Sequence, residues 1–323
     1  MTQLSRRTFL EIVSLASAGL LGGCGGSTGS ENFTVPVFSD VHFQPFIDPF
    51  LPNTATLNPA TTAANKVLVA QLDAADASAW PAILAGAANS APSAFLTDTN
   101  YTLLSLALDS IKQNLGTSPA VLFTGDFLGH GMNLLYLAYS ANKTSADADA
   151  FVDKTLTFVL QQIRTAVGSR PVYFALGNCD SYTDEGPGST FLANNAQQLY
   201  TLALNGAGNE QDVISTLTNG GYYSVDLVGT NLTIIGLNTF ALSPGITANT
   251  TLINDQFAWF DTQLAKASTA GKKVWLLMHA PPGAVEGTTA QSANANGQIT
   301  TATMMWTGAI RNSSWASLKN IPA

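Results

Sequence analysis

Four short apolar runs in this chain are each followed or ended by a polar side chain of a type that binds metal ions. Val35–Phe38, Ala120–Phe123, Pro171–Leu176 and Val274–His279 have the length and composition of buried strands. In the same order, the polar residues at their ends are Asp40 with His42, Asp126, Asn178 and His279. Because open α/β sheets gather ligands beyond the C-terminal ends of their strands, this repeated placement predicts one shared site.

The rest of the pattern predicts a layered α/β fold. Apolar residues at helical spacing indicate helices over Tyr101–Leu115, Asp147–Val167 and Asn254–Ala270, and Tyr222–Leu227 and Leu232–Leu237 read as paired strands. Phe43–Pro59 and Glu286–Thr301 are predicted loops. With 46% hydrophobic and 11% charged residues, the chain can bury a large core, and we expect one domain over residues 33–323.

The residue types at the strand ends suit divalent cations. Asp40 and His42 are two residues apart, so a regular strand would place both side chains on one face. Asp126 has two oxygens with which to bridge two cations, Asn178 offers a neutral oxygen, and His279 offers an imidazole nitrogen. Mixed nitrogen and oxygen ligands favour Zn²⁺, Fe or Mn²⁺ over Ca²⁺. Taken singly, each residue also suits a turn or a structural role, and only their ordered conjunction indicates a metal centre.

The short sequence motifs around these residues resemble those of a known protein family. "FSDVHFQPF", "TGDFLGHG", "PVYFALGNCDSY" and "LLMHAPPG" resemble the acid-sphingomyelinase-like phosphodiesterases among the calcineurin-like metallophosphoesterases, over Phe38 to Gly283. The resemblance implies an α/β/β/α sandwich holding two divalent metal ions, Zn²⁺ before Fe or Mn²⁺. Asp40 and His42 would bind one ion, Asn178 and His279 the other, and Asp126 both. A metal-bound hydroxide would then attack phosphorus.

The sequence departs from the family pattern after the asparagine. The family has a histidine general acid there, whereas this chain has Cys179, whose thiol is a poorer proton donor. His130, four residues after Asp126, matches a phosphate-contacting histidine of the subgroup and is predicted to be the general acid. Cys179 and Asp180 are expected to contact the metal ligands and orient them, without binding the cations themselves.

A second departure concerns the last family motif, G-H-x-H, because no histidine follows His279. We expect the C-terminal strands of the sandwich to be missing, and each cation to keep three protein ligands. A fragment of a longer phosphodiester hydrolase is the first interpretation. A degenerate, non-catalytic surface lipoprotein, a phosphomonoesterase or nucleotidase, and a one-metal hydrolase remain alternatives.

The N-terminus resembles a bacterial export signal. "SRRTFL" has the twin-arginine form, the apolar run Ile12–Leu21 is too short for a membrane span, and "LGGC" ends at Cys24. These features predict a signal peptide over residues 1–23, lipid on Cys24, a flexible tether over residues 24–32, and export to the periplasm or cell exterior. With a net charge of −8 the chain is not expected to bind nucleic acid. The expected partners are a small-molecule or phospholipid phosphodiester and, through the lipid anchor alone, a membrane.

Overall fold

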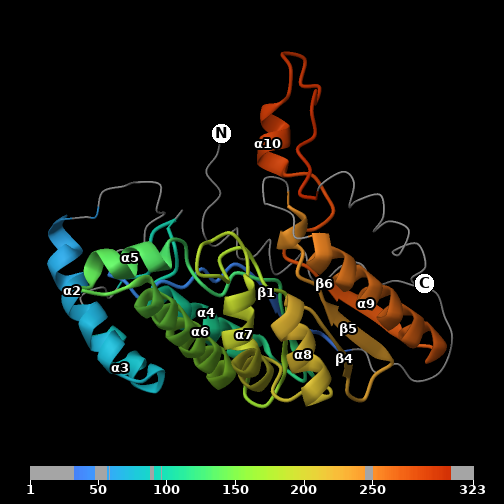
Figure 1. Cartoon of the computed structure of the whole chain (residues 1–323), viewed down its shortest axis with the longest axis horizontal. Coiled ribbons are helices and arrows are strands. Elements are labelled where there is room, and N and C mark those ends of the chain that lie inside the picture. Colours follow the sequence, from blue (N-terminus) through green and yellow to red (C-terminus); the bar gives the residue numbers. More distant parts are fainter. Residues whose placement is uncertain are drawn as a thin grey trace. The chain divides into compact units, whose positions relative to one another are not determined.

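Two three-stranded sheets contain the six predicted strands (Figure 1). In the first sheet, β1 (Val37–Phe38), β2 (Val121–Phe123) and β3 (Val172–Phe174) are parallel neighbours in that order. In the second, β4 (Tyr223–Leu227) pairs antiparallel with β5 (Leu232–Gly236), and β6 (Lys273–Leu277) runs parallel to β5. The predicted α/β class is confirmed.

This structure is a computed structural model that describes residues 33–47, 57, 59–87, 91–95, 97–243 and 250–306. Two compact units are distinguished, Met1–Phe33 and Thr34–Ala323, and the fold described here belongs to the second. The predicted signal peptide, the tether over residues 24–32 and the proposed lipid attachment point Cys24 lie outside the described residues.

The two sheets meet at β3 and the hairpin β4–β5. The buried Tyr223 hydroxyl donates to the carbonyl oxygen of Phe174 at 2.9 Å and accepts from the N–H of Phe174 at 2.6 Å. Gly236 of β5 lies so close that a Cβ there would stand 2.6 Å from the Phe174 carbonyl oxygen. This contact permits glycine alone, and it brings the strand ends of the two sheets together.

Helices lie beside the strands, and in Figure 1 α4–α7 lie to the left of the second sheet and α9 to its right. Among the described residues they are α2 (Pro59–Ala74), α3 (Trp80–Gly86), α4 (Tyr101–Asn114), α5 (Met132–Tyr139), α6 (Ser145–Val167), α7 (Ser189–Gln198), α8 (Glu210–Gly220), α9 (Thr250–Thr269) and α10 (Glu286–Gln291), with the short turns η1 (Ala77–Ala79), η2 (Leu199–Ala203) and η3 (Phe240–Leu242). No helix within these ranges is both long enough and apolar enough to span a bilayer.

Local sequence explains where the longest helix begins and ends. The Thr144 hydroxyl accepts from the N–H of Asp147 while the Asp147 carboxylate accepts from the N–H of Thr144, which satisfies two amides at the start of α6. Gly168, with a φ of +68°, ends it. In the second sheet, Phe260 and Leu264 of α9 pack on Ile235 and Leu237, which covers one face of β5.

One loop prediction is wrong, and another loop is more buried than its composition suggests. Glu286–Thr301 contains the helix α10 and an antiparallel bridge between Ala293 and Ile299. Residues 43–47, the described start of the predicted loop Phe43–Pro59, form neither helix nor strand, but they are buried: Phe43 and Phe46 insert among the aromatic rings of Phe158, Phe151 and Tyr139. The prolines of this stretch suggest an exposed loop, whereas its first apolar residues pack in the interior.

Candidate metal centre

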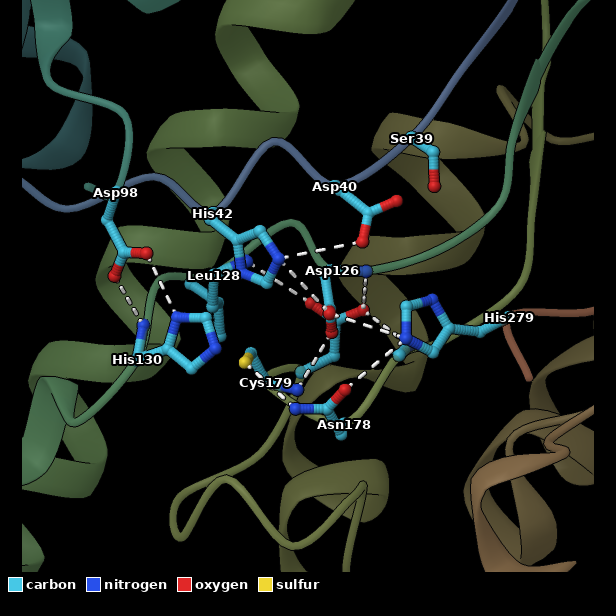
Figure 2. Close-up of polar contacts among 12 residues, drawn as sticks. Ser39, Asp40, His42, Asp98, Asp126, Leu128, His130, Asn178, Cys179 and His279 are labelled. Atoms are coloured by element: carbon cyan, nitrogen blue, oxygen red, sulfur yellow. Dashed lines mark hydrogen bonds and ion pairs between the residues drawn. The ribbon is translucent and has the colours of Figure 1, made fainter. Parts of the chain in front are cut away.

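All five predicted ligands converge beyond the C-terminal ends of the strands (Figure 2). Asp126 Oδ2 lies 3.4 Å from His42 Nε2 and 3.4 Å from His279 Nε2. His42 Nε2 is also 3.6 Å from Asp40 Oδ1, and His279 Nε2 is 3.3 Å from Asn178 Oδ1. Asp126 is therefore the member that both halves of the cluster share, and it is only 2% exposed.

The loops that carry three of these residues use left-handed backbone. Asp40, His42 and Asp126 have φ angles of 54°, 43° and 63°, a conformation that costs most side chains energy and that aspartate tolerates better than most. Asp40 and His42 do not lie in a regular strand, contrary to the prediction from their spacing, because β1 ends before them. They face each other because the loops stay paired: the N–H of Asp40 donates to Gly125 O, and that of His42 to Asp126 O.

The carboxylate of Asp180 organises the turns beneath the cluster. Its Oδ2 accepts from the N–H groups of Asp126 and Gly177, and its Oδ1 accepts from those of Phe127 and Leu128. Asp180 is fully buried. Burial and the charge of Asp126 raise the pKa of Asp180, whereas the amide donors oppose that rise. This one side chain joins the turn after β2 to the turn after β3.

Glycine is required on both of these turns. A Cβ on Gly125, whose φ is +115°, would stand 2.5 Å from His279 Nδ1. A Cβ on Gly177 would collide with the carboxylate of Asp126. The glycines of "TGD" and "LGN" therefore let the ligand loops approach one another to bonding distance.

A hydrogen bond sets the ring orientation and the tautomer of His279. Its Nδ1 lies 3.0 Å from the carbonyl oxygen of Thr124, which can only accept, so Nδ1 carries the proton and Nε2 presents a lone pair toward Asp126. His42 differs, because its buried Nδ1 has no partner among the described residues. Burial acts to lower the pKa of His42, but contacts with Asp40 and Asp126 outweigh it and raise that pKa.

Asp98, which the sequence pattern did not indicate, holds His130 in place. The Asp98 carboxylate, 3% exposed, accepts from the backbone N–H of His130 at 2.7 Å and lies 2.9 Å from its Nδ1. It also accepts from Gln44 Nε2 at 2.6 Å. The hydrogen bond with Asp98 raises the pKa of His130, whose ring stacks on that of His42 at 4.6 Å. Asp98 follows no predicted strand, so the strand-end pattern could not reveal it.

Cys179 contacts two of the predicted ligands, Asn178 and Asp126. Its N–H donates to Asp126 Oδ1 at 2.8 Å, and its thiol accepts from Asn178 Nδ2 at 3.1 Å. The side chain is 1% exposed, and burial raises the pKa of the thiol well above its usual range. The thiol therefore stays protonated, and its contacts orient Asn178 and Asp126.

The donor set fits divalent cations. Ligand atoms of Asp40, His42 and Asp126 all lie within 4.8 Å of one another. Burial acts to raise the pKa of Asp40, but hydrogen bonds to His42 and Ser39 outweigh it and hold the pKa low. Burial raises the pKa of Asp126, a buried carboxylate that a cation would stabilise in its charged form.

No protein-family profile matches the chain, but individual known proteins are similar to it. "Sphingomyelinase phosphodiesterase C" of Dictyostelium discoideum is 30% identical over 190 residues, which is 58% of this chain and 39% of that protein. "Cyclic GMP-AMP phosphodiesterase SMPDL3A" of Homo sapiens is 31% identical over 193 residues, with the same coverage of 58% and 39%. The chain thus spans about two fifths of the length of these curated relatives. A dimetal phosphatase from Danio rerio aligns over 68% of this chain and 67% of its own, at 15% identity and a TM-score of 0.38.

Proposed function

We propose that this chain hydrolyses phosphodiesters with the help of two divalent cations. Its homologues are acid-sphingomyelinase-like phosphodiesterases, which is consistent with the calcineurin-like metallophosphoesterase superfamily. The observation that supports this most directly is the convergence of Asp40, His42, Asn178 and His279 on one shared carboxylate, Asp126. Asp40, His42 and Asp126 would hold one cation, and Asp126, Asn178 and His279 the other. Two imidazoles in the set favour Zn²⁺ over Mn²⁺ or Fe.

When bound, such cations neutralise phosphoryl oxygens and lower the pKa of coordinated water. The chain's own residues supply the rest of the chemistry. His130 carries a proton on Nδ1 facing Asp98, so Nε2 is the ring nitrogen that can donate to a departing alkoxide. The hydrogen bond with Asp98 raises the pKa of His130, which favours the protonated imidazolium. Cys179, buried and protonated, takes no part in that transfer.

Metal content and turnover of the purified protein test this proposal together. We expect about two equivalents of metal by mass spectrometry and hydrolysis of bis(4-nitrophenyl) phosphate, with both lost on chelation. Asp126→Asn should abolish metal retention and activity, and Asp109→Asn, an exposed change on α4, should alter neither. One equivalent without diesterase activity would indicate a one-metal hydrolase. No metal would indicate a non-catalytic scaffold.

The role of His130 needs a separate measurement, because its loss should not release metal. His130→Ala should keep both equivalents and slow diesters with alkyl leaving groups by about 10²- to 10⁴-fold. Diesters that release 4-nitrophenolate need little protonation and should be affected far less. Equal losses on both substrate types, or full turnover of alkyl diesters, would remove His130 from the acid role.

A further inference from the structure

Three side chains at one edge of the predicted metal cluster form a second set of potential metal ligands. One ligand atom from each of His42, His130 and Cys179 lies within 4.8 Å of the other two. In Figure 2 the sulfur of Cys179 faces the ring of His130. The two-cation arrangement proposed above uses only His42 from this set. The imidazole of His130 and the thiol of Cys179 therefore remain available to another ion.

Existing contacts determine which ring nitrogens can bind such an ion. His42 Nε2 faces the carboxylates of Asp40 and Asp126, whereas its buried Nδ1 has no hydrogen-bond partner among the described residues. His130 Nδ1 faces the carboxylate of Asp98, which leaves its Nε2. Histidines that bind metals commonly donate the opposite ring N–H to a carboxylate. Both imidazoles are thus oriented as metal ligands, through His42 Nδ1 and His130 Nε2.

The surroundings of the Cys179 thiol favour a cation. Burial first, and then the negative charges of Asp126, Asp184, Asp180 and Asp98, raise the pKa of this thiol. Carboxylates that oppose a thiolate would stabilise a positive ion at the same place. A divalent cation that bonds to the sulfur releases the thiol proton to solvent, so the site gains a net positive charge that these carboxylates offset.

One sulfur and two imidazole nitrogens select thiophilic cations. Zn²⁺ is commonly held by cysteine and histidine, with three protein ligands and one position left for water. Mn²⁺ prefers carboxylate and carbonyl oxygens, so it would bind this set poorly. The His130 side chain is 30% exposed, which gives an ion a path from solvent to the buried sulfur.

We propose that His42, His130 and Cys179 form an inhibitory site for a thiophilic divalent cation such as Zn²⁺. Binding there does not depend on catalysis, whereas the inhibition rests on the proposed phosphodiesterase function. When His42 Nδ1 binds an ion, its Nε2 keeps the ring proton and cannot bind the first cation of the cluster. The same ion occupies the His130 nitrogen that would protonate the leaving group. Excess Zn²⁺ would therefore stop the hydrolysis that two correctly placed ions support.

Cadmium provides a spectroscopic test that needs no turnover. Cd²⁺ bound to sulfur has a charge-transfer absorption in the ultraviolet, and Cd²⁺ bound only to nitrogen and oxygen lacks it. Titration of the full-length protein with Cd²⁺ should produce this absorption, and Cys179→Ser should abolish it. Cys24→Ser, which removes the only other cysteine of the chain, should keep it. His130→Ala should raise the half-saturating Cd²⁺ concentration by about tenfold or more, whereas the control Asp109→Asn should leave it unchanged.

Hydrolysis of bis(4-nitrophenyl) phosphate tests the inhibition. The protein with two equivalents of Zn²⁺ should lose activity as Zn²⁺ is added further, and excess Mn²⁺ should not inhibit it. In Cys179→Ser, the Zn²⁺ concentration that halves the variant's own initial rate should rise by about tenfold or more.

Absence of the cadmium absorption, or equal half-saturation in the parent and His130→Ala, would overturn the site. Absorption with undiminished turnover would overturn its inhibitory role and leave the phosphodiesterase function intact. If no diester is hydrolysed, that function fails, and the cadmium titration alone decides on the site.

Discussion

Asp98 and His130 form a carboxylate–imidazole pair next to the ring of His42. The carboxylate fixes both the orientation and the protonated nitrogen of the imidazole, while the opposite ring nitrogen stays free to donate. Among the described residues the Asp98 carboxylate forms hydrogen bonds with Gln44 and His130, and neither belongs to the predicted metal cluster. It is therefore a positioning residue, and its loss should change proton transfer more than metal binding.

Asp98→Asn should lower kcat on alkyl diesters by about 10- to 100-fold while metal content stays at the parental level. The sign of the pH effect follows from the pKa of His130, which Asp98 raises above the ordinary value of 6.5. His130 donates only when protonated, so activity falls as pH rises through its pKa. Without the carboxylate that pKa drops, and the alkaline limb of the kcat profile should move to lower pH.

Asp109→Asn removes an equivalent charge from the exposed face of α4 and serves as the control for Asp98→Asn. It should leave both kcat and the alkaline limb where they are. An unshifted limb in Asp98→Asn, with kcat intact, would show that the carboxylate supports only the fold.

At the scale of elements, Gly236 decides how closely the two sheets approach. In Gly236→Ala the new methyl group would stand 2.6 Å from the Phe174 carbonyl oxygen, a backbone atom that cannot rotate away. We expect a loss of about 1–3 kcal/mol in the free energy of unfolding, measured by urea denaturation. Gly86→Ala, where nothing lies within 4 Å, should be neutral or stabilising by up to about 1 kcal/mol. Equal stabilities of the two variants would contradict the close approach.

The six strands and helices α4, α6 and α9 could be predicted from the sequence because each combines apolar periodicity with a clear boundary. Helices α5 and α8 were missed, since the first begins directly after the glycine turn of His130 and the second is polar on most of its surface. The five predicted ligand residues do lie beyond strand ends, although Asp40 and His42 follow β1 outside any regular strand. Asp98 depends on a contact 32 residues away, which local sequence cannot indicate.

At the scale of the molecule, the metal cluster would join the two sheets. Asp40, His42, Asp126 and Asn178 follow strands of the first sheet, whereas His279 follows β6 of the second. Cations bound between them would stabilise the folded state by about 4 kcal/mol at a thousandfold excess over the dissociation constant. A chelator should therefore lower the melting temperature by several degrees, and Zn²⁺ should restore it.

His279→Ala should reduce that chelator effect, because it removes the ligand that reaches from the second sheet. The measurement is a thermal melt of parent and variant with and without chelator. A melting temperature that does not respond to metal in the parent would argue against cations spanning the two sheets.

The N-terminal prediction also belongs to this scale. If residues 1–23 direct export and Cys24 carries lipid, the protein should fractionate with membranes and be released by Cys24→Ser. Cell fractionation with immunoblotting checks this, and Cys179→Ser serves as the control because Cys179 lies buried in the folded domain. Membrane association that survives Cys24→Ser would rule out the lipid anchor.

The clamp formed by Asp180 affects how the centre would acquire its ions. One carboxylate holds the amides of both turns, the one with the shared ligand Asp126 and the one leading to Asn178. If two cations bind as proposed, we expect a change in one turn to affect the other through Asp180, so that metal occupancy rises cooperatively along a sigmoidal titration rather than in two separate steps. Loss of Asp180 should therefore empty both predicted cation positions at once. A single substitution would then turn a hydrolase into an inert scaffold.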